Sequence, residues 1–201
     1  MSRLLLVRHG ETELNSAERY WGSTDVRLST AGFGQAEQLR ELLAAEKIDA
    51  VYSSPLSRAQ VTAEIIASDH RLAVITCPEI QEVNFGQLEG LTFAEVGQRY
   101  PEVTRMWIER NPGLKYPGGE SVMDFYHRVG RFLGRLEKHT PDETVLVVAH
   151  SGSLRILMCH LLGLEVEHWR QFRLDMASLS ILETYPEGAI LNQLNEVCHL
   201  R

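Results

Sequence analysis

The chain has 201 residues, of which 44% are hydrophobic and 23% are charged. These proportions are typical of a globular protein, and they exclude a disordered, collagen-like or fibrous chain. With Lys+Arg at 20 and Asp+Glu at 27, the formal net charge is -7, so the surface repels nucleic acid and anionic membranes on average.

Cysteines and apolar runs limit the class of protein further. The cysteines at positions 77, 159 and 198 form no C-x-x-C pair, so neither a disulfide framework nor a zinc cluster is expected. The apolar run at residues 4–7 is too short for a signal peptide, and no later run reaches membrane-spanning length. We therefore expect a cytoplasmic protein without membrane or nucleic-acid partners. Since no repeat or linker is evident, residues 1–201 are predicted to form a single domain.

Short apolar runs and helical spacings alternate along the chain. The runs are unbroken, as in strands that are covered on both faces, and the helical stretches repeat apolar residues every three or four positions. Strands are predicted at residues 3–7, 50–52, 72–76 and 144–149. Helices are predicted to begin after Ser29, at Pro55 behind Ser54 as N-cap, and to cover 92–100, 102–109, 122–136 and 152–162.

Two parts of the chain depart from this alternation. A loop rich in Gly and Pro at residues 111–119 follows two short helices, so residues 91–120 are expected to form a helical, cap-like insertion. Residues 178–183 and 189–194 alternate in polarity around a turn, which indicates a hairpin or two edge strands. The alternation of strands and helices elsewhere favours a three-layer α/β/α sandwich with a mostly parallel central sheet.

Polar residues of unusual type follow the ends of three predicted strands. Arg8 and His9 come directly after the first strand, Arg58 stands in the first turn of the helix after the second strand, and His150 and Ser151 follow a later strand. In open α/β sheets, ligands bind beyond the carboxyl ends of the strands. These side chains are therefore expected to share one edge of the sheet.

The residue types at this edge suit phosphoryl transfer. The guanidinium groups of Arg8 and Arg58 match the geometry of phosphate, and the predicted helix N-termini nearby would add N–H donors. Arginines favour the neutral form of a neighbouring imidazole such as His9, which can then attack phosphorus without a metal. Glu82 and Glu89, in a loop after the third strand, are candidates for the acid that protonates the leaving alkoxide.

Five motifs follow one another along the chain. They are LLVRHGETELN at residues 5–15, YSSPLSRA at 52–59, QEVNFG at 81–86 with Glu89–Gly90, PGGES at 117–121 and VAH at 148–150. Each motif is moderately specific, but the ordered set closely resembles the histidine phosphatase superfamily, whose fold is phosphoglycerate mutase-like. The resemblance covers nearly the whole chain.

This resemblance implies a role for each matching residue. His9 would be the nucleophile that forms a phosphohistidine, and Glu82 would protonate the leaving group and then activate water. Glu89 is assigned a structural role. The phosphoryl group would be held by Arg8, Arg58, Asn15, His150 and a backbone N–H just after His150.

Three further residues are expected at the substrate. Trp21 stands where many relatives have Gln or Ser, so its indole would narrow the pocket or line it with an apolar wall. Gly22 follows it and is expected to contact the substrate. Ser151 stands where the family often has Gly; its backbone would meet the phosphate, and its hydroxyl would be within reach of the substrate.

The resemblance implies a phosphatase that hydrolyses a small phosphate monoester without metal or cofactor. The chain is most similar to the bacterial branch with α-ribazole, broad-specificity and metal-independent phosphoserine phosphatases. Phosphoserine specificity is an alternative, although that group is expected to have His where Phe85 stands. The resemblance also suggests a homodimer.

Other functions fit parts of the sequence. Phosphoglycerate mutases of the family are longer and have an extra basic segment in the middle, where residues 91–116 are short and contain few basic residues. Residues 149–153 resemble the nucleophile elbow of serine hydrolases, but Ser153 stands where that motif needs Gly. A catalytically inactive binding module conflicts with the presence of every expected catalytic residue.

Overall fold

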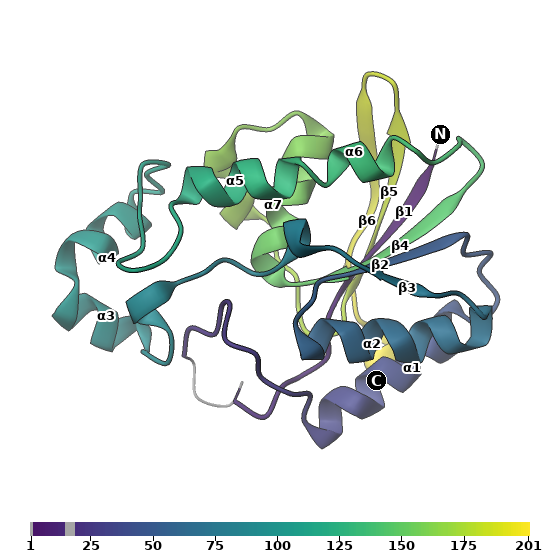
Figure 1. The fold of residues 1–201 in the computed structure, drawn as a ribbon, viewed down its shortest axis with the longest axis horizontal. Helices are drawn as coiled ribbons and strands as arrows, with labels where there is room; N and C mark the ends of the chain where they lie inside the picture. Colours follow the sequence, from purple (N-terminus) through teal and green to yellow (C-terminus); the bar gives the residue numbers. More distant parts are fainter. Residues whose placement is uncertain (1, 15–18) are drawn as a thin grey trace.

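The computed structural model describes residues 2–14 and 19–201 of the chain. Within these residues a six-stranded sheet has the order β3-β2-β4-β1-β5-β6 (Figure 1). The parallel strands are β1 (Arg3–Arg8), β2 (Ala50–Ser53), β3 (Val74–Thr76) and β4 (Thr144–Ala149). An antiparallel hairpin completes one edge, formed by β5 (Leu179–Tyr185) and β6 (Gly188–Glu196). The predicted, mostly parallel sheet is confirmed.

Helices cover both faces of the sheet (Figure 1). On one face lie α1 (Thr30–Leu43) and α2 (Ser57–Ala67). On the other face lie α5 (Val122–Gly130), α6 (Leu133–Leu136) and α7 (Ser151–Leu162). Successive strand residues point to opposite faces, so Leu5 and Val7 join the apolar core beneath α1 and α2, and Leu4 and Leu6 join the core beneath α5 and α7. The three-layer prediction is confirmed.

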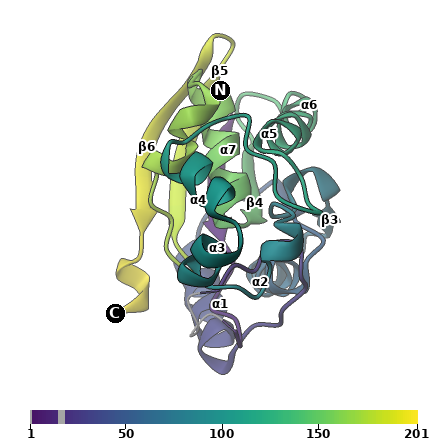
Figure 2. The ribbon, with the colours of Figure 1, turned by 90° about the vertical axis from the view of Figure 1, so that its left-hand side faces the viewer.

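Two short helices lie apart from these layers. They are α3 (Phe93–Arg99) and α4 (Pro101–Ile108), which stand together at one end of the molecule (Figures 1 and 2). Thr92 begins α3 with a capping box that includes Glu95. This is the region expected to form the cap-like insertion at residues 91–120. Short 3₁₀ turns complete the described chain: η2 (Ser68–His70), η3 (Pro78–Ile80), η4 (Gly86–Leu88), η5 (Val166–Gln171) and η6 (Cys198–Leu200).

The predicted start of the second helix is wrong. α2 begins at Ser57, after Leu56, and not at Pro55. The hydroxyl of Ser54 does not cap a helix because it is fully buried and bonded elsewhere: it accepts the N–H of Leu56 and pairs with Nε2 of His150. A tertiary contact thus overrides the local capping signal.

The predicted helix at 122–136 is also wrong in one respect, because it is two helices. The N–H of Phe132 bonds to the carbonyl of Val129, three residues back, and the chain forms a turn between α5 and α6. The apolar face nevertheless continues across this turn, since Phe125, Val129 and Phe132 are all buried. No helix in the described part of the chain is both long and apolar enough to cross a bilayer.

Candidate active site

Two neighbouring parallel strands bring the two histidines together. β1 pairs with β4 so that Arg8 lies opposite Ala149, and the chain leaves both strands at the same edge of the sheet. The N–H of His9 donates to the carbonyl of Ala149 at 3.0 Å. The ring centroids of His9 and His150 are 5.0 Å apart.

A polar pocket of about 100 Å³ opens at this edge. Five residues singled out in the sequence line it: Arg8, His9, Trp21, Arg58 and Glu82. Thr12, Arg19 and Val26 complete the wall. The pocket wall does not include Gly22, His150 or Ser151, and Asn15 lies outside the described residues.

His9 has the protonation state that a nucleophile requires. Its Nδ1 lies 2.7 Å from the carbonyl oxygen of Gly10, so Nδ1 carries the proton and Nε2 keeps its lone pair. Burial, followed by the charges of Arg58 and Arg8, holds the pKa of His9 well below its usual value. The ring is therefore neutral at physiological pH and able to attack phosphorus through Nε2.

His150 and Arg58 are held in a fixed relation to each other. Nε of Arg58 donates to Nδ1 of His150 at 3.2 Å, and Nε2 of His150 then donates to the hydroxyl of Ser54 at 2.7 Å. Burial, and next the charge of Arg58, holds the pKa of His150 well below its usual value. Both ring nitrogens are engaged, so in this structure His150 orients Arg58.

The loop that carries Trp21 holds Arg58 from the other side. Nη2 of Arg58 donates to the carbonyl of Gly22 at 2.7 Å, and Nη1 donates to the carbonyl of Thr24 at 2.8 Å. Gly22 has no room for a side chain, because a Cβ would lie 2.0 Å from the carbonyl oxygen of Val83. Gly22 therefore serves the site through its backbone, by fixing the guanidinium.

Glu89 anchors the same loop. Its carboxylate accepts the backbone N–H groups of Ser23 and Thr24, both at 2.8 Å, and their hydroxyl groups as well. Four donors on one carboxylate leave it little capacity for proton transfer to a substrate. This geometry fits the structural role expected of Glu89.

Arg8 and Arg58 have no carboxylate partner among the described residues. Arg8 donates through Nη1 to the carbonyl of Leu174 at 2.6 Å, and its buried Nε has no acceptor within the described ranges. Burial lowers the pKa of Arg8 to about 10 and also lowers that of Arg58, yet both stay protonated at neutral pH. Because buried cations are costly without an anion, this pair suits a phosphate dianion.

Glu82 sits at the N-terminus of α7. Its Oε2 accepts the N–H of Gly152 at 2.9 Å, and its Oε1 accepts the N–H of Val83 at 3.0 Å. The predicted helix N-termini thus serve other groups, because the N–H of Ser57 in α2 likewise donates to Asp25. No hydrogen bond of the Ser151 N–H, at the start of α7, is found among the described residues, so this N–H stays available as a donor.

Ser54 is the residue of this site that sequence reasoning missed, since it was interpreted only as a cap. Its role depends on the sheet order: β2 lies beside β4, so the residue after β2 lies near the residue after β4. The wall residues Thr12, Arg19 and Val26 were missed as well. Arg19 donates to the carbonyl of Gly90 and pairs with Glu95 at 2.8 Å. No local pattern marks it, because its place in the pocket depends on tertiary contacts.

A neutral nucleophilic imidazole, two arginines and a carboxyl group at one sheet edge define an enzyme of phosphoryl transfer. Comparison with known proteins gives the family, because residues 4–197 match the histidine phosphatase superfamily (branch 1). The chain belongs to this superfamily, and it is a phosphoric monoester hydrolase. The predicted family and activity are confirmed.

Similar proteins carry phosphatase names. The chain is 38% identical over 200 residues to phosphoserine phosphatase 1 of Hydrogenobacter thermophilus, covering 100% of this chain and 95% of that protein. It is 35% identical over 193 residues to the adenosylcobalamin/alpha-ribazole phosphatase of Escherichia coli, covering 96% and 95%. Among solved structures, a phosphoserine phosphatase mutant from Entamoeba histolytica in complex with phosphoserine superposes with a TM-score of 0.89 at 28% identity, over 100% of both chains.

Proposed function

We propose that this enzyme hydrolyses small phosphate monoesters through a phosphohistidine on Nε2 of His9, with Glu82 as the acid and base. One observation carries the proposal: the His9 ring is neutral, has its Nδ1 proton fixed by Gly10, and lies beside two arginines that have no carboxylate partner within residues 2–14 and 19–201. The site thus places a nucleophilic lone pair beside two cations that suit a phosphate dianion.

The reaction follows in two steps. Nε2 of His9 attacks phosphorus while the bond to the ester oxygen breaks, and that oxygen takes a proton from the Glu82 carboxyl group. Glu82, now a carboxylate, removes a proton from water, which attacks the phosphohistidine and releases inorganic phosphate. Arg8 and Arg58 neutralise the oxygens of the phosphoryl group in both steps.

The identity of the leaving alcohol would define the specificity of the enzyme. The two named relatives act on esters of different kinds, phosphoserine and alpha-ribazole phosphate, and both specificities are candidates here. Phe85 packs in an aromatic cluster with Tyr20 and Tyr116, at ring-centroid distances of 5.2 and 5.0 Å. A phosphoglycerate mutase is the alternative activity, and it differs in keeping the phosphoryl group from water.

A panel of small phosphate esters tests the proposal. The enzyme is dialysed against EDTA, and phosphate release is measured for each ester and for p-nitrophenyl phosphate. We expect turnover without added metal. Conversion of 3-phosphoglycerate to 2-phosphoglycerate without free phosphate would instead identify a mutase. The cytoplasmic location, the homodimer, the absence of nucleic-acid partners and the single domain at 1–201 stay predictions.

A further inference from the structure

The arginines that are buried or partly buried in the described residues fall into two groups. One group has a carboxylate within ion-pair distance and consists of Arg3, Arg40, Arg128 and Arg135. The other group has no such carboxylate within residues 2–14 and 19–201, and it consists of Arg8, Arg58, Arg155 and Arg170. Acidic residues outnumber basic ones in this chain, so a shortage of carboxylates does not explain the second group. Two of its members hold the phosphoryl group, and the other two have no role in the site described so far.

Arg155 lies close to the catalytic acid. It stands on α7, about one turn beyond Gly152, whose N–H binds Glu82. Its Nε is buried and has no hydrogen-bond partner in the described part of the chain. Burial lowers the pKa of Arg155, the Glu82 carboxylate raises it, and the charge of Arg170 lowers it again. Besides burial, the positive charge of Arg155 also lowers the pKa of Arg8. Arg155 therefore stands about one helical turn from the N–H that holds Glu82, on the helix against which the segment of Arg170 packs.

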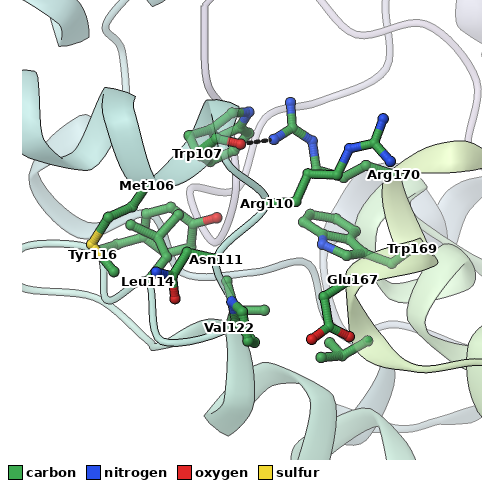
Figure 3. A pocket seen from close by; sticks show the side chains of 12 residues that line it. Met106, Trp107, Arg110, Asn111, Leu114, Tyr116, Val122, Glu167, Trp169 and Arg170 are labelled. Carbon is green, nitrogen blue, oxygen red and sulfur yellow. Dashed lines mark hydrogen bonds between the residues drawn. The ribbon is translucent and has the colours of Figure 1, made fainter.

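Arg170 is held rigidly by its contacts with Trp107. It belongs to η5, which packs against α7. Its guanidinium lies over the ring of Trp107, 4.8 Å from the centroid, and donates to the carbonyl oxygen of the same residue (Figure 3). Arg170 and the exposed Arg110 line a second pocket, distinct from the catalytic one (Figure 3). Burial lowers the pKa of Arg170, and the charge of Arg110 lowers it further. Arg110 and Arg170 therefore both face this second pocket. Glu167 lines it as well, but within the described residues no ion pair joins its carboxylate to either arginine.

A buried hydroxyl lies on the same side. Tyr116 is 1% exposed, and its hydroxyl has no hydrogen-bond partner among the described residues. In Figure 3 this hydroxyl points into the pocket, toward the side on which Arg170 lies. Burial raises the pKa of this hydroxyl, the charge of Arg170 lowers it, and the charge of Glu82 raises it. Such a donor costs free energy unless a ligand accepts its proton.

We propose that Arg155 and Arg170, together with the hydroxyl of Tyr116, bind an anionic substituent on the leaving alcohol, a carboxylate or a second phosphate. The assignment rests on the proposed function, because Glu82 must face the leaving oxygen in order to protonate it. Arg8 and Arg58 hold the phosphoryl group that is transferred. The substituent binds on the other side of Glu82, where the two remaining arginines stand. An ester of a neutral alcohol leaves both arginines without a partner.

Matched substrates test this subsite. In the first pair, 3-phosphoglycerate has a carboxylate where glycerol 3-phosphate has a hydroxymethyl group. In the second pair, fructose 1,6-bisphosphate has a second phosphate that fructose 6-phosphate lacks. In the unaltered enzyme, kcat/KM is expected to be about 10- to 100-fold higher for the charged member of one pair, as charge-assisted hydrogen bonds predict. The pair that shows the difference identifies the anion as carboxylate or phosphate.

Two variants assign the effect to residues. Arg155→Met and Arg170→Met are each expected to lower kcat/KM for the charged ester about 10-fold or more, mainly through KM, with less than threefold change for its neutral partner. Arg155→Lys should restore part of the loss. Arg131→Met, which removes an exposed arginine on the turn after α5, is the matched control and should change neither value.

Product inhibition of the unaltered enzyme supplies a measurement that needs no variant. Glycerate should inhibit turnover of p-nitrophenyl phosphate at lower concentration than glycerol if the anion is a carboxylate. Equal kcat/KM within both pairs, or equal losses for charged and neutral esters in the variants, overturns the subsite. If p-nitrophenyl phosphate itself is not hydrolysed and His9 is not phosphorylated, the proposed function fails instead, so the two failures are distinguishable.

Discussion

Replacing Gly152 by Ala should displace the catalytic acid without unfolding the protein. A Cβ at this position would lie 2.3 Å from Oε1 of Glu82 and 3.1 Å from its Cδ. Ordinary van der Waals contact begins at 3.4 Å, so the carboxyl group must retreat by about 1 Å. The helix backbone of α7 cannot give way as easily, because it begins directly after β4 in the centre of the sheet.

The size of the effect follows from this displacement. Misplacing a catalytic group by about 1 Å can cost roughly 100-fold in rate, or about 2.7 kcal/mol of activation free energy. Gly152 stands in the first turn of α7, and a Gly-to-Ala change at a position with compatible backbone angles stabilises a protein by about 0.4–1 kcal/mol, because the unfolded chain has less freedom to lose. The variant should therefore be folded and slow.

Leaving groups of different basicity provide the assay. Glycerol is a poor leaving group that needs the proton from Glu82, whereas p-nitrophenolate leaves without one. In single-turnover phosphorylation of His9, Gly152→Ala should lose about 100-fold with glycerol 3-phosphate and only a few-fold with p-nitrophenyl phosphate. Gly134→Ala is the control, since a Cβ on Gly134 of α6 meets no atom within 4 Å. Equal losses with both esters, or full activity with glycerol 3-phosphate, would refute the reasoning.

Three other predictions follow from the site. His9→Ala should abolish turnover and the acid-labile, base-stable labelling of the enzyme by substrate phosphate; an active variant contradicts the mechanism. Because His9 and His150 have lowered pKa values in the fold, only the unfolded chain takes up their protons below about pH 6.5. Each should therefore reduce the free energy of unfolding by about 1.4 kcal/mol per pH unit below that point. Urea unfolding at pH 7, 6 and 5 measures this, and a constant value over that range is the opposite result. Ser54→Ala should leave two buried donors unpaired, on Leu56 and His150, at a cost of about 1–3 kcal/mol. It should also weaken inhibition by inorganic phosphate because His150 no longer holds Arg58; unchanged stability and inhibition would exclude this role.

The layers of the fold could be predicted because their signals are local. β1 and β4 are unbroken apolar runs, and their position in the centre of the sheet follows from burial on both faces. The convergence of Arg8, His9 and His150 follows from the same placement, since parallel strands end at one edge. The motifs then supplied the chemistry of these residues.

What could not be predicted depends on contacts between distant segments. Ser54 has the local pattern of a cap, and only the neighbouring end of β4 shows its pairing with His150. Gly22 was expected at the substrate, but its carbonyl is used by Arg58. Arg155 stands out because it has no carboxylate partner among the described residues, and a sequence pattern cannot indicate that a partner is lacking.

The strand order has a consequence for how the enzyme is made. β1 lies between β4 and β5, so it touches neither β2 nor β3. During synthesis the apolar residues of β1 therefore remain without a neighbouring strand until β4 has left the ribosome. Such distant pairing is expected to fold slowly and to expose an aggregation-prone edge meanwhile. Because His9 and His150 are joined by this late step, nascent chains that end before α7 should neither bind phosphate nor refold into an active form.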